Sequence, residues 1–344
     1  MTIRLYNEKD SNRWESYVNH SDGSSCYHHI GWKDVIEKTF GHKTHYLIAE
    51  NQNGEMTGLL PLVHLKSLLF GSFMVSLPYF NYGGVCADNE EISDELVREA
   101  VRIAQLEKAS HIELRHSRPM TNGMPVKTGK VSMVLDLPED WENLWNGFSS
   151  NLRRKIRKPA KEGMEARIGR EEELDNFYAV FSINMRDLGT PVYSKDFFRN
   201  ILEVFPDNTW ICTVYSREAK PVASLFMVDF KESIEMPWVS SIRSFNKFYP
   251  NFLLYWTALK FGCEKGYKAF DFGRSTPGEG TYRFKEQWGA KPRQLYWHYW
   301  LRDGGPLPEI NPHNPKYQLA IKLWSKLPVG VTRVFGPGIV RNLP

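Results

Sequence analysis

Two parts of the chain repeat one pattern of apolar and polar residues, about 160 residues apart. Residues 46–66 and 211–231 each contain an apolar run, a short polar turn and a second apolar run. Residues 99–117 and 257–275 match without a gap, and each is a helical segment followed by an alternating strand that ends on a serine. The repetition predicts a duplicated α/β unit, with mixed sheets flanked by helices. Two such units would form a cleft, and junctions between domains are favoured ligand sites.

The chain of 344 residues is long enough for two domains of ordinary size. We expect a first domain at residues 1–125, a second at 130–305 and a basic amphipathic tail at 306–344. The stretch 118–129 is rich in Pro and Gly, and is therefore expected to link the two domains.

The composition is that of a globular protein, with 42% hydrophobic and 24% charged residues. The net charge of +4 is too small to imply bulk binding of nucleic acid. The 4 cysteines are far apart and form no CxxC pair, which argues against a disulfide framework or a zinc site. The N-terminal residues hold no apolar core of signal-peptide length, and the longest apolar stretch, 68–80, is too short to span a bilayer. We therefore expect a cytoplasmic protein.

Hydrophobic periodicity and turn residues place the elements of both copies. In the first copy we expect strands at 3–6 and 111–115, a hairpin turning at 53–54, and helices at 12–19, 30–40 and 93–108. In the second copy we expect strands at 131–137, 268–272 and 294–301, and helices at 141–156, 172–188, 195–205 and 251–265. Ser93 and Asn251 are the expected N-caps, and Gly41 and Gly266 the residues that end their helices.

The sequence contains no motif of a hydrolase, a P-loop or a dinucleotide-binding protein. His42 and His45 are three residues apart, but no third ligand with matching spacing is near, so the sequence predicts no metal site. No nucleophile and base occur as a recognisable pair, which points away from covalent catalysis.

A dense positive segment spans residues 151–163. Leu152 and Ile156 form an apolar seam, so one face of this helix is expected to pack on the protein. The remaining faces carry the cations Arg153, Arg154, Lys155, Arg157, Lys158 and Lys161. Such a surface suits a phosphate-bearing ligand, because guanidinium groups bind phosphate in a bidentate manner. The alternative is an ordinary solvated helix face.

A second polar cluster follows the strand at 268–272. Asp271 and Arg274 leave that strand for a loop rich in Gly and Pro, and the residues that follow include Tyr282, Lys285 and Trp288. Polar groups that leave a core strand for a loop often build a site. Lys285 lies between aromatic residues, where the field of its charge is poorly screened. The alternative is that Asp271 and Arg274 pair only to close the strand.

A third candidate segment, residues 76–84, is aromatic and rich in glycine. Tyr79, Asn81 and Tyr82 could line a groove for a sugar or a peptide. An aromatic loop that packs at the domain junction explains the same residues.

Together these segments resemble the FemAB-type peptidoglycan-bridge transferases, above all the FemAB-like proteins found beside exosortase and exopolysaccharide genes. The resemblance covers nearly the whole chain and is carried by residues 32–42, 58–84, 151–163, 250–275 and 284–292. It implies two tandem acyltransferase folds of the GNAT superfamily. It also implies that Lys285, in the motif FKxxW, stabilises the charge of the reacting acyl centre. Arg154, Arg157 and Tyr82 correspond to positions that contact a phosphorylated acceptor.

The resemblance implies an enzyme that forms an amide on a cell-envelope or exopolysaccharide precursor, by direct attack of an amine on an activated acyl donor. No tightly bound cofactor is expected. The donor is aminoacyl-tRNA or acyl-CoA, and the chain lacks the GNAT loop motif that binds the pyrophosphate of acetyl-CoA. Asp271 is a candidate proton acceptor or orienting group, and Arg274 completes the catalytic set; Tyr79, Asn81, Tyr82, Lys158, Tyr282 and Trp288 are candidate substrate contacts.

Two other functions remain open on the sequence alone. One is an acyl-CoA-dependent N-acyltransferase that acts on a small amine. The other is a non-catalytic module whose basic helix binds RNA or another polyanion.

The C-terminal residues have no acid after Glu309, and cations alternate there with apolar side chains. Such a tail could lie on the anionic inner face of a membrane, near lipid-linked intermediates. The alternative is a helix that packs back on the protein.

Overall fold

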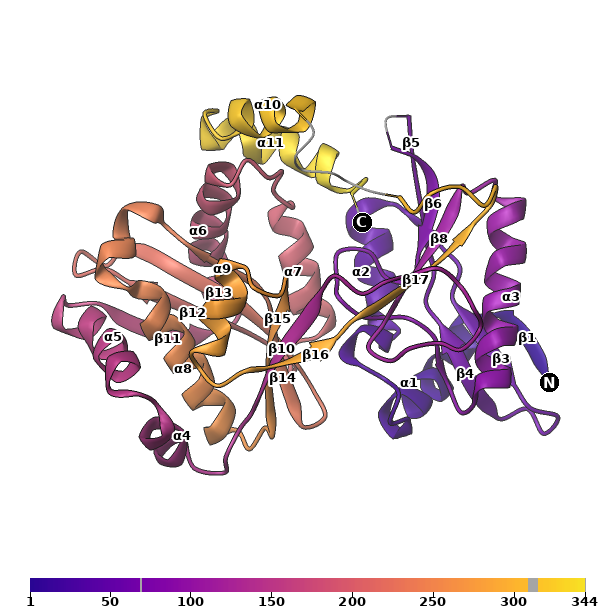
Figure 1. The fold of residues 1–344 in the computed structure, drawn as a ribbon, viewed down its shortest axis with the longest axis horizontal. Coiled ribbons are helices and arrows are strands. Elements are labelled where there is room, and N and C mark those ends of the chain that lie inside the picture. The colour runs from indigo at the N-terminus through magenta and orange to yellow at the C-terminus, as the bar shows by residue number, and fades with distance from the viewer. Residues whose placement is uncertain (69, 309–314, 344) are drawn as a thin grey trace. The chain divides into compact units, whose positions relative to one another are not determined.

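The computed structural model describes residues 1–68, 70–308 and 315–343, and the chain forms two compact units (Figure 1). The first unit contains residues 1–131, 293–309 and 341–344, and the second contains residues 132–292 and 310–340. Both units combine sheets with covering helices.

The first unit has a four-stranded sheet, in the order β1-β3-β4-β7, and a six-stranded sheet, in the order β2-β5-β6-β8-β17-β9. The strands are β1 (Thr2–Leu5), β2 (Lys43–Thr44), β3 (Leu47–Glu50), β4 (Met56–Leu60), β5 (Val63–Ser67), β6 (Gly71–Val75), β7 (Cys86–Ala87), β8 (His111–His116), β9 (Val126–Lys127) and β17 (Tyr296–Leu301). The helices are α1 (Ser11–His20), α2 (Gly31–Phe40) and α3 (Glu90–Leu106).

The ends of these elements follow local chemistry. Gly41 ends α2 with φ 64°, and Gly54 turns the β3–β4 hairpin with φ 77°, as the sequence predicts. The N-cap of α3 is Asn89 and not Ser93, because the Asn89 side chain accepts a hydrogen bond from the backbone N–H of Ile92. The buried face of α3, with Leu96 among its residues, packs in the core of this unit.

The second unit is built on a seven-stranded sheet in the order β11-β12-β13-β14-β15-β10-β16. Its strands are β10 (Val131–Asp136), β11 (Glu165–Gly169), β12 (Thr209–Tyr215), β13 (Pro221–Phe230), β14 (Ser233–Ser241), β15 (Ala269–Ser275) and β16 (Lys291–Gln294). Its helices are α4 (Trp141–Gly147), α5 (Ser150–Lys161), α6 (Leu174–Asp187), α7 (Lys195–Val204), α8 (Pro250–Glu264), α9 (Gly280–Glu286), α10 (Pro315–Trp324) and α11 (Val329–Val340).

Helices cover both faces of this sheet. Neighbouring residues of a strand point to opposite sides, so the contacts of single side chains show which helix lies on which face. Phe226 on β13 packs edge-on against Phe177 of α6 and also contacts Phe198 of α7. On the other face, Trp210 of β12 packs against Phe261 of α8, with ring centroids 5.0 Å apart. The sheet is therefore buried between α6 and α7 on one side and α8 on the other.

The repeated sequence pattern corresponds to a repeated topology. In the first unit α3 connects β6 to β8, which run parallel; in the second unit α8 connects β14 to β15, which also run parallel. The β3–β4 and β12–β13 hairpins each pair antiparallel within one sheet. They differ in the second strand, because β13 is continuous whereas the corresponding run of the first unit is divided into β4 and β5, which belong to different sheets.

The single helix expected at 141–156 is two helices, α4 and α5. Phe148 is extended, with φ −75° and ψ 145°, and Ser149 caps α5 by accepting from the backbone N–H of Leu152. The apolar periodicity continues across the break because Phe148 packs on Trp256 and Trp288.

The expected cap of α8 is also wrong. Tyr249, with φ 62°, is the residue before the helix, and Pro250 is its first residue. Proline is favoured there because its fixed φ suits the first turn and its missing N–H needs no partner. Asn251 lies inside the helix and donates to Ser241 Oγ at 3.1 Å.

The compact units differ from the expected boundaries at the C-terminal side. Strand β17 pairs antiparallel with β8, so residues 293–309 belong to the first unit and not to a second domain at 130–305. Strand pairing over such a separation leaves no periodic signal in the sequence. Residues 309–314 and 344 of the expected tail lie outside the described residues. Its helix α11 packs on α6, where Arg333 Nε donates to Ser182 Oγ at 2.9 Å.

Candidate active site in the second unit

Strands β14 and β15 pair over only part of their length. Their register joins Ser233–Glu235 to Ala269–Asp271, whereas β14 runs on to Ser241 and β15 to Ser275. Buried backbone groups need hydrogen-bond partners. The part of β15 beyond Asp271 therefore depends on side chains for some of its partners, and this is where the predicted catalytic residues lie.

Lys285 on α9 supplies two of these hydrogen bonds. Its Nζ donates to the backbone carbonyls of Gly273, at 2.9 Å, and Arg274, at 3.0 Å. The residue is only 8% exposed. Burial lowers the pKa of the Lys285 ammonium from 10.5 to about 8; the carboxylates of Asp271 and Glu235 oppose this shift, and the guanidinium of Arg274 adds to it. Lys285 is thus a cation held in a poorly solvated position, as its aromatic neighbours in the sequence suggest.

Asp271 shapes the same segment. Its Oδ1 accepts hydrogen bonds from the backbone N–H of Gly273, at 2.7 Å, and from Ser132 Oγ on β10. Gly273 has φ 74°, a conformation that favours glycine. The carboxylate therefore fixes the bend that turns the carbonyls of Gly273 and Arg274 toward Lys285. The side chain of Arg274 itself is exposed.

Glu235 belongs to this site but was not predicted from the sequence. It lies directly opposite Asp271 in the β14–β15 register and is 7% exposed. A carboxylate inside the otherwise apolar run 234–239 was the available signal.

The structure places Trp288 in the core, and not where the sequence predicted a substrate contact. Its side chain is 1% exposed and lies within an aromatic cluster. The ring partners of Trp288 in this cluster are Phe148, Phe252, Tyr255 and Phe284. Trp288 therefore supports α9 from inside the core. Tyr282, one turn before Lys285 on the same helix, is half-buried.

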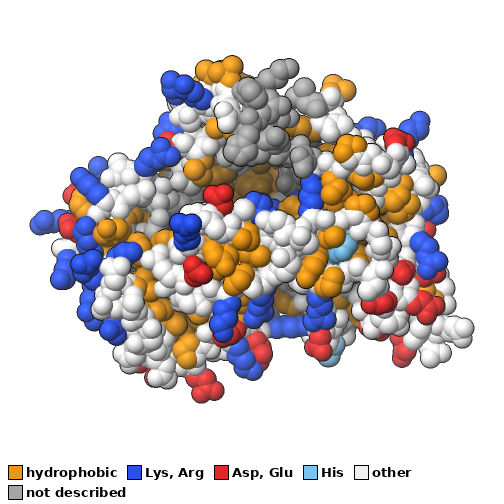
Figure 2. Space-filling view, viewed as in Figure 1, with side chains coloured by type: hydrophobic (Ala, Val, Ile, Leu, Met, Phe, Trp, Pro, Cys, Tyr) orange, Lys and Arg blue, Asp and Glu red, His pale blue; other side chains and the backbone are white. Residues whose placement is uncertain are grey.

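The basic helix α5 borders a groove of about 620 Å³. Figure 2 shows Lys and Arg side chains gathered at the side of the second unit where Figure 1 draws α5. Among the described residues, the lining contains no acid. The lining residues are Ser150, Arg153, Arg154, Lys155, Arg157, Lys158, Lys161 and Tyr249. The groove is therefore suited to a ligand with several negative charges.

Neighbouring groups position the groove cations. Lys158 Nζ lies 4.6 Å from the ring centroid of Tyr249 and donates to the carbonyl of Lys247 at 2.9 Å. The Arg157 guanidinium lies 5.0 Å from the ring centroid of Trp145. Arg154 is exposed, and its Nη2 donates to Asn151 Oδ1 at 3.0 Å. The predicted cations Arg154, Arg157 and Lys158 thus share one surface.

The groove connects to the helix that carries Lys285. Lys155 Nζ lies 3.4 Å from Gln287 Oε1, directly after α9, and 5.1 Å from the ring centroid of Phe252. Phe252 in turn stacks on Trp288. Lys155 therefore contacts both the residue after α9 and the aromatic cluster that supports this helix.

The predicted residues of the first unit lie in other surroundings. The Tyr79 hydroxyl donates to the backbone carbonyl of Arg341 at 2.7 Å, which gives Tyr79 a structural role at the chain end. Asn81 and Tyr82 are half-buried, and Tyr82 lines a cavity of about 130 Å³ with His28, Arg115 and other residues of this unit. The structure thus groups Lys285, Asp271, Arg274, Tyr282 and the groove cations in one unit, and Tyr79, Asn81 and Tyr82 in the other.

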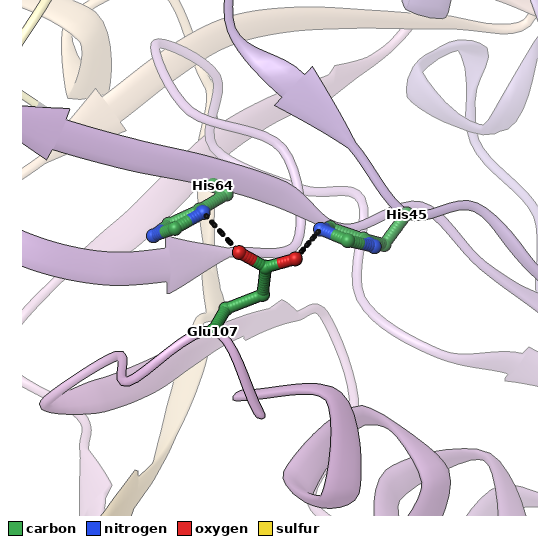
Figure 3. A group of neighbouring side chains, drawn as sticks. All are labelled: His45, His64 and Glu107. Atoms are coloured by element: carbon green, nitrogen blue, oxygen red, sulfur yellow. Dashed lines mark ion pairs between the residues drawn. The ribbon is translucent and has the colours of Figure 1, made fainter. Parts of the chain in front are cut away.

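In the sequence, no third potential ligand with matching spacing lies near His42 and His45, and the expectation of no metal site stays a prediction. His64 and Glu107 are brought to His45 by the fold, with one potential ligand atom of each residue within 4.8 Å of the others (Figure 3).

Comparisons with known proteins place this geometry in a class. Residues 146–286 match the family described as acetyltransferase (GNAT) domain. The crystal structure of FemX is similar over 93% of this chain and 100% of that chain, with a TM-score of 0.66 and 15% sequence identity. L-PGS from Bacillus licheniformis is similar over 94% of this chain and 100% of its own, with a TM-score of 0.55 and 15% identity. A tandem GNAT protein from the clavulanic acid biosynthesis pathway is similar over 89% of this chain and 100% of its own, with a TM-score of 0.55 and 10% identity. No curated protein matches the chain by sequence.

The GNAT domain and the fold define the class as an acyltransferase. The expected fold of two tandem GNAT-like units is confirmed. The likeness to FemAB-type proteins is confirmed at the level of the fold by FemX. In the described part of the chain, no helix combines the length and the apolar character needed to cross a bilayer.

Proposed function

We propose that this chain transfers an aminoacyl group from aminoacyl-tRNA to an amine of a phosphorylated or lipid-linked precursor of the cell envelope or an exopolysaccharide. The observation that carries the proposal is the buried ammonium of Lys285 at the divergence of β14 and β15. The basic groove on α5 supports a phosphate-bearing substrate.

In the proposed reaction a neutral amine attacks the carbonyl carbon of the donor ester. The new C–N bond forms while the carbonyl oxygen becomes negative; collapse of this intermediate breaks the ester C–O bond, and the leaving hydroxyl takes the proton that the amine loses. An ammonium has three N–H donors, and Lys285 directs two of them at carbonyls of β15. The proposal assigns the third to the oxyanion, and stabilisation of an oxyanion often contributes more than any other effect to the acceleration of acyl transfer.

Asp271 acts in this scheme as a positioning residue. Its bond to the backbone N–H of Gly273 holds the bend that aligns Lys285. Holding the two reactants in place supplies much of the remaining acceleration. Arg274 on β15 and Tyr282 on α9 both precede Lys285 in the chain and are proposed to contact the substrate.

The groove cations would bind phosphates of the donor, the acceptor or both, because several unpaired phosphate charges are neutralised best by a dense cationic surface. Aminoacyl-tRNA is favoured over acyl-CoA because the pyrophosphate-binding loop motif of acetyl-CoA-dependent GNAT proteins is absent from the sequence. An acyl-CoA donor with a small amine acceptor is the competing enzyme function.

Equilibrium binding of charged tRNA, uncharged tRNA and several acyl-CoAs to the purified chain tests the donor. Tighter binding of charged tRNA than of any acyl-CoA, followed by transfer to an amine, supports the proposal. Binding of acyl-CoA alone supports the competing enzyme. Equal binding of charged and uncharged tRNA without transfer would identify a polyanion-binding module and would contradict an enzymatic role.

The C-terminal helices support a contact with a lipid surface on the cytoplasmic side. α11 packs on α6 with one face, but α10 and α11 also present large apolar side chains to solvent. Exposed lysines lie among them, as expected of a helix that binds anionic lipid. The exposed apolar residues are Leu319, Ile321, Leu323, Val331, Val334 and Phe335. The side chain of Lys316, also expected in this tail, lies outside the described residues.

Co-sedimentation with anionic vesicles tests this contact. The substitutions Leu323→Ser and Phe335→Ser are expected to weaken vesicle binding, since both side chains are exposed and apolar. Leu106→Ser is the matched control, because Leu106 is also exposed but ends α3 in the first unit. Vesicle binding that is the same in all three variants would contradict the contact.

A further inference from the structure

Three side chains from separate elements of the first unit converge on one point (Figure 3). His45 follows β2, His64 lies on β5, and Glu107 is the residue directly after α3. In the β2–β5 register Lys43 lies opposite His64, and His45 is two residues beyond Lys43. Because side chains alternate along a strand, Lys43, His45 and His64 share one face.

The potential ligand atoms of this group all lie within 4.8 Å of one another. His45 Nε2 lies 3.7 Å from Glu107 Oε1, and His64 Nδ1 lies 3.6 Å from Glu107 Oε2. Zinc binds imidazole nitrogen and carboxylate oxygen at about 2.0–2.2 Å, so its tetrahedral ligands lie about 3.3 Å apart. A shift of a few tenths of an ångström would bring the carboxylate and each ring to that separation.

The two imidazoles are held as ligands would be. His64 Nε2 lies 2.8 Å from Ser72 Oγ, which leaves Nδ1 facing Glu107. Outer hydrogen bonds of this kind fix the tautomer and orientation of metal-binding histidines. His45 Nε2 is buried, points toward the carboxylate and has no hydrogen-bond partner among the described residues. An orphaned nitrogen in this position indicates a missing partner.

The surroundings of the His45 and His64 imidazoles also suit a bound cation. Burial lowers the pKa of both His45 and His64, and metal binding uses the neutral form of an imidazole. Glu107 lies at the C-terminal end of α3, where the helix dipole attracts positive charge. The ammonium of Lys43 uses this attraction, since its Nζ lies 2.5 Å from Glu107 Oε1. Lys43 is 61% exposed and is free to swing into solvent.

We propose that His45 Nε2, His64 Nδ1 and the Glu107 carboxylate bind a divalent transition-metal ion, zinc in the first place, with water as the fourth ligand. Imidazole with one carboxylate is a donor set that zinc accepts. Lys43 occupies the cation position when the metal is absent and is displaced when the metal binds. The bound ion ties β2, β5 and the end of α3 together, and so stabilises the first unit.

The test is metal binding by the full-length chain without a histidine tag. After treatment with a chelator, titration calorimetry with Zn²⁺ is expected to give one ion per chain, and Co²⁺ is expected to give the visible absorption bands of a four-coordinate site. His64→Ala and Glu107→Gln are each expected to weaken Zn²⁺ binding by at least about tenfold, and Ser72→Ala by about tenfold through the lost outer hydrogen bond. His20→Ala, at an exposed helical histidine, is the control and should leave the affinity unchanged.

Lys43→Ala gives the most specific readout, because it removes the cation that competes for Glu107. We expect this variant to bind Zn²⁺ more tightly than the wild-type chain. Circular dichroism of each variant identifies those that fail to fold, and Glu107→Gln, at a partly exposed residue, remains informative if the histidine variants do not fold. Absence of Zn²⁺ and Co²⁺ binding by the wild-type chain, or equal binding by wild type and Glu107→Gln, would overturn the proposal.

Discussion

The ammonium nitrogen of Lys285 lies 2.9 Å from the backbone carbonyl oxygen of Gly273, and this bond joins α9 to β15 where β15 has left its partner β14. The side chain of Lys285 is therefore charged, buried and hydrogen-bonded to the backbone at the same time. The same ammonium that supports the bent strand is the group proposed to stabilise the oxyanion. Variants of Lys285 and of its neighbours can separate these two roles.

The pH dependence of acyl transfer should show the titration of Lys285. Its pKa is lowered to about 8, so the ammonium is lost as the pH rises through that value. If the charged form stabilises the oxyanion, kcat/KM falls above about pH 8. Steady-state rates between pH 6 and pH 10, with an acceptor in excess, measure this limb. A rate that instead rises with a midpoint near pH 8 would assign Lys285 the role of a base.

The free energy of unfolding should also depend on the titration of the Lys285 ammonium. The pKa of an unfolded lysine is about 10.4, so between about pH 8 and pH 10.4 the unfolded state binds more protons than the folded state. The free energy of unfolding should therefore rise with pH across this range in the wild type. Lys285→Met should lose this contribution. Urea titrations at a series of pH values check the difference between the two proteins.

Glu235 should affect the pH at which Lys285 loses its proton. Its carboxylate raises the pKa of the Lys285 ammonium, against the effect of burial. Glu235→Gln is therefore expected to move the falling limb of the pH–rate profile to lower pH. The control is Glu232→Gln, because Glu232 is exposed and pairs with Lys268. An unchanged limb in Glu235→Gln would show that the two groups do not interact.

The groove cations should govern the salt dependence of ligand binding. Each of Arg154→Ala and Arg157→Ala is expected to weaken tRNA binding and to reduce the slope of log K against log salt by about 1. Arg98→Ala serves as the control, since Arg98 is an exposed helical arginine of the first unit. Fluorescence anisotropy over a range of salt concentrations measures the slopes. Equal slopes for all four proteins would remove α5 from the binding surface.

Trp288 should matter for stability rather than for contact with substrate. It is fully enclosed by aromatic rings, so Trp288→Ala should lower the free energy of unfolding by about 3–5 kcal/mol. Tyr282→Ala, at a half-buried position of the same helix, should cost much less. Guanidinium titrations compare the two variants. Unchanged stability in Trp288→Ala would restore the interpretation of Trp288 as a substrate contact.

Local patterns predicted much of the fold. Gly41 and the Asn53–Gly54 turn are recognisable because each needs a backbone conformation that few residues adopt. The break between α4 and α5 was missed because Phe148 continues the apolar periodicity while its backbone is extended. The place of β17 beside β8 was missed because strand partners are selected by the whole sheet and not by the strand's own sequence.

In the candidate site, too, local sequence patterns indicate some residues, whereas others depend on contacts between distant segments. The aromatic neighbours of Lys285 and the dense cations of α5 make both segments candidates in the sequence, whereas the catalytic role of Lys285 in the FKxxW motif comes from the resemblance to FemAB-type transferases. Glu235 and the group of His45, His64 and Glu107 depend on contacts between distant segments, and so they become visible only in the structure. Burial likewise separates Trp288, which packs, from Tyr282, which remains partly accessible.

The central claim is tested most directly by the rate of aminoacyl transfer to an amine acceptor in the wild type, Lys285→Ala and the exposed-lysine control Lys291→Ala. Loss of an oxyanion-stabilising group costs about 10²–10³ in kcat. The account predicts a loss of that size in Lys285→Ala, with tRNA affinity retained, and no loss in Lys291→Ala. A folded Lys285→Ala protein that transfers the aminoacyl group at the wild-type rate would contradict it.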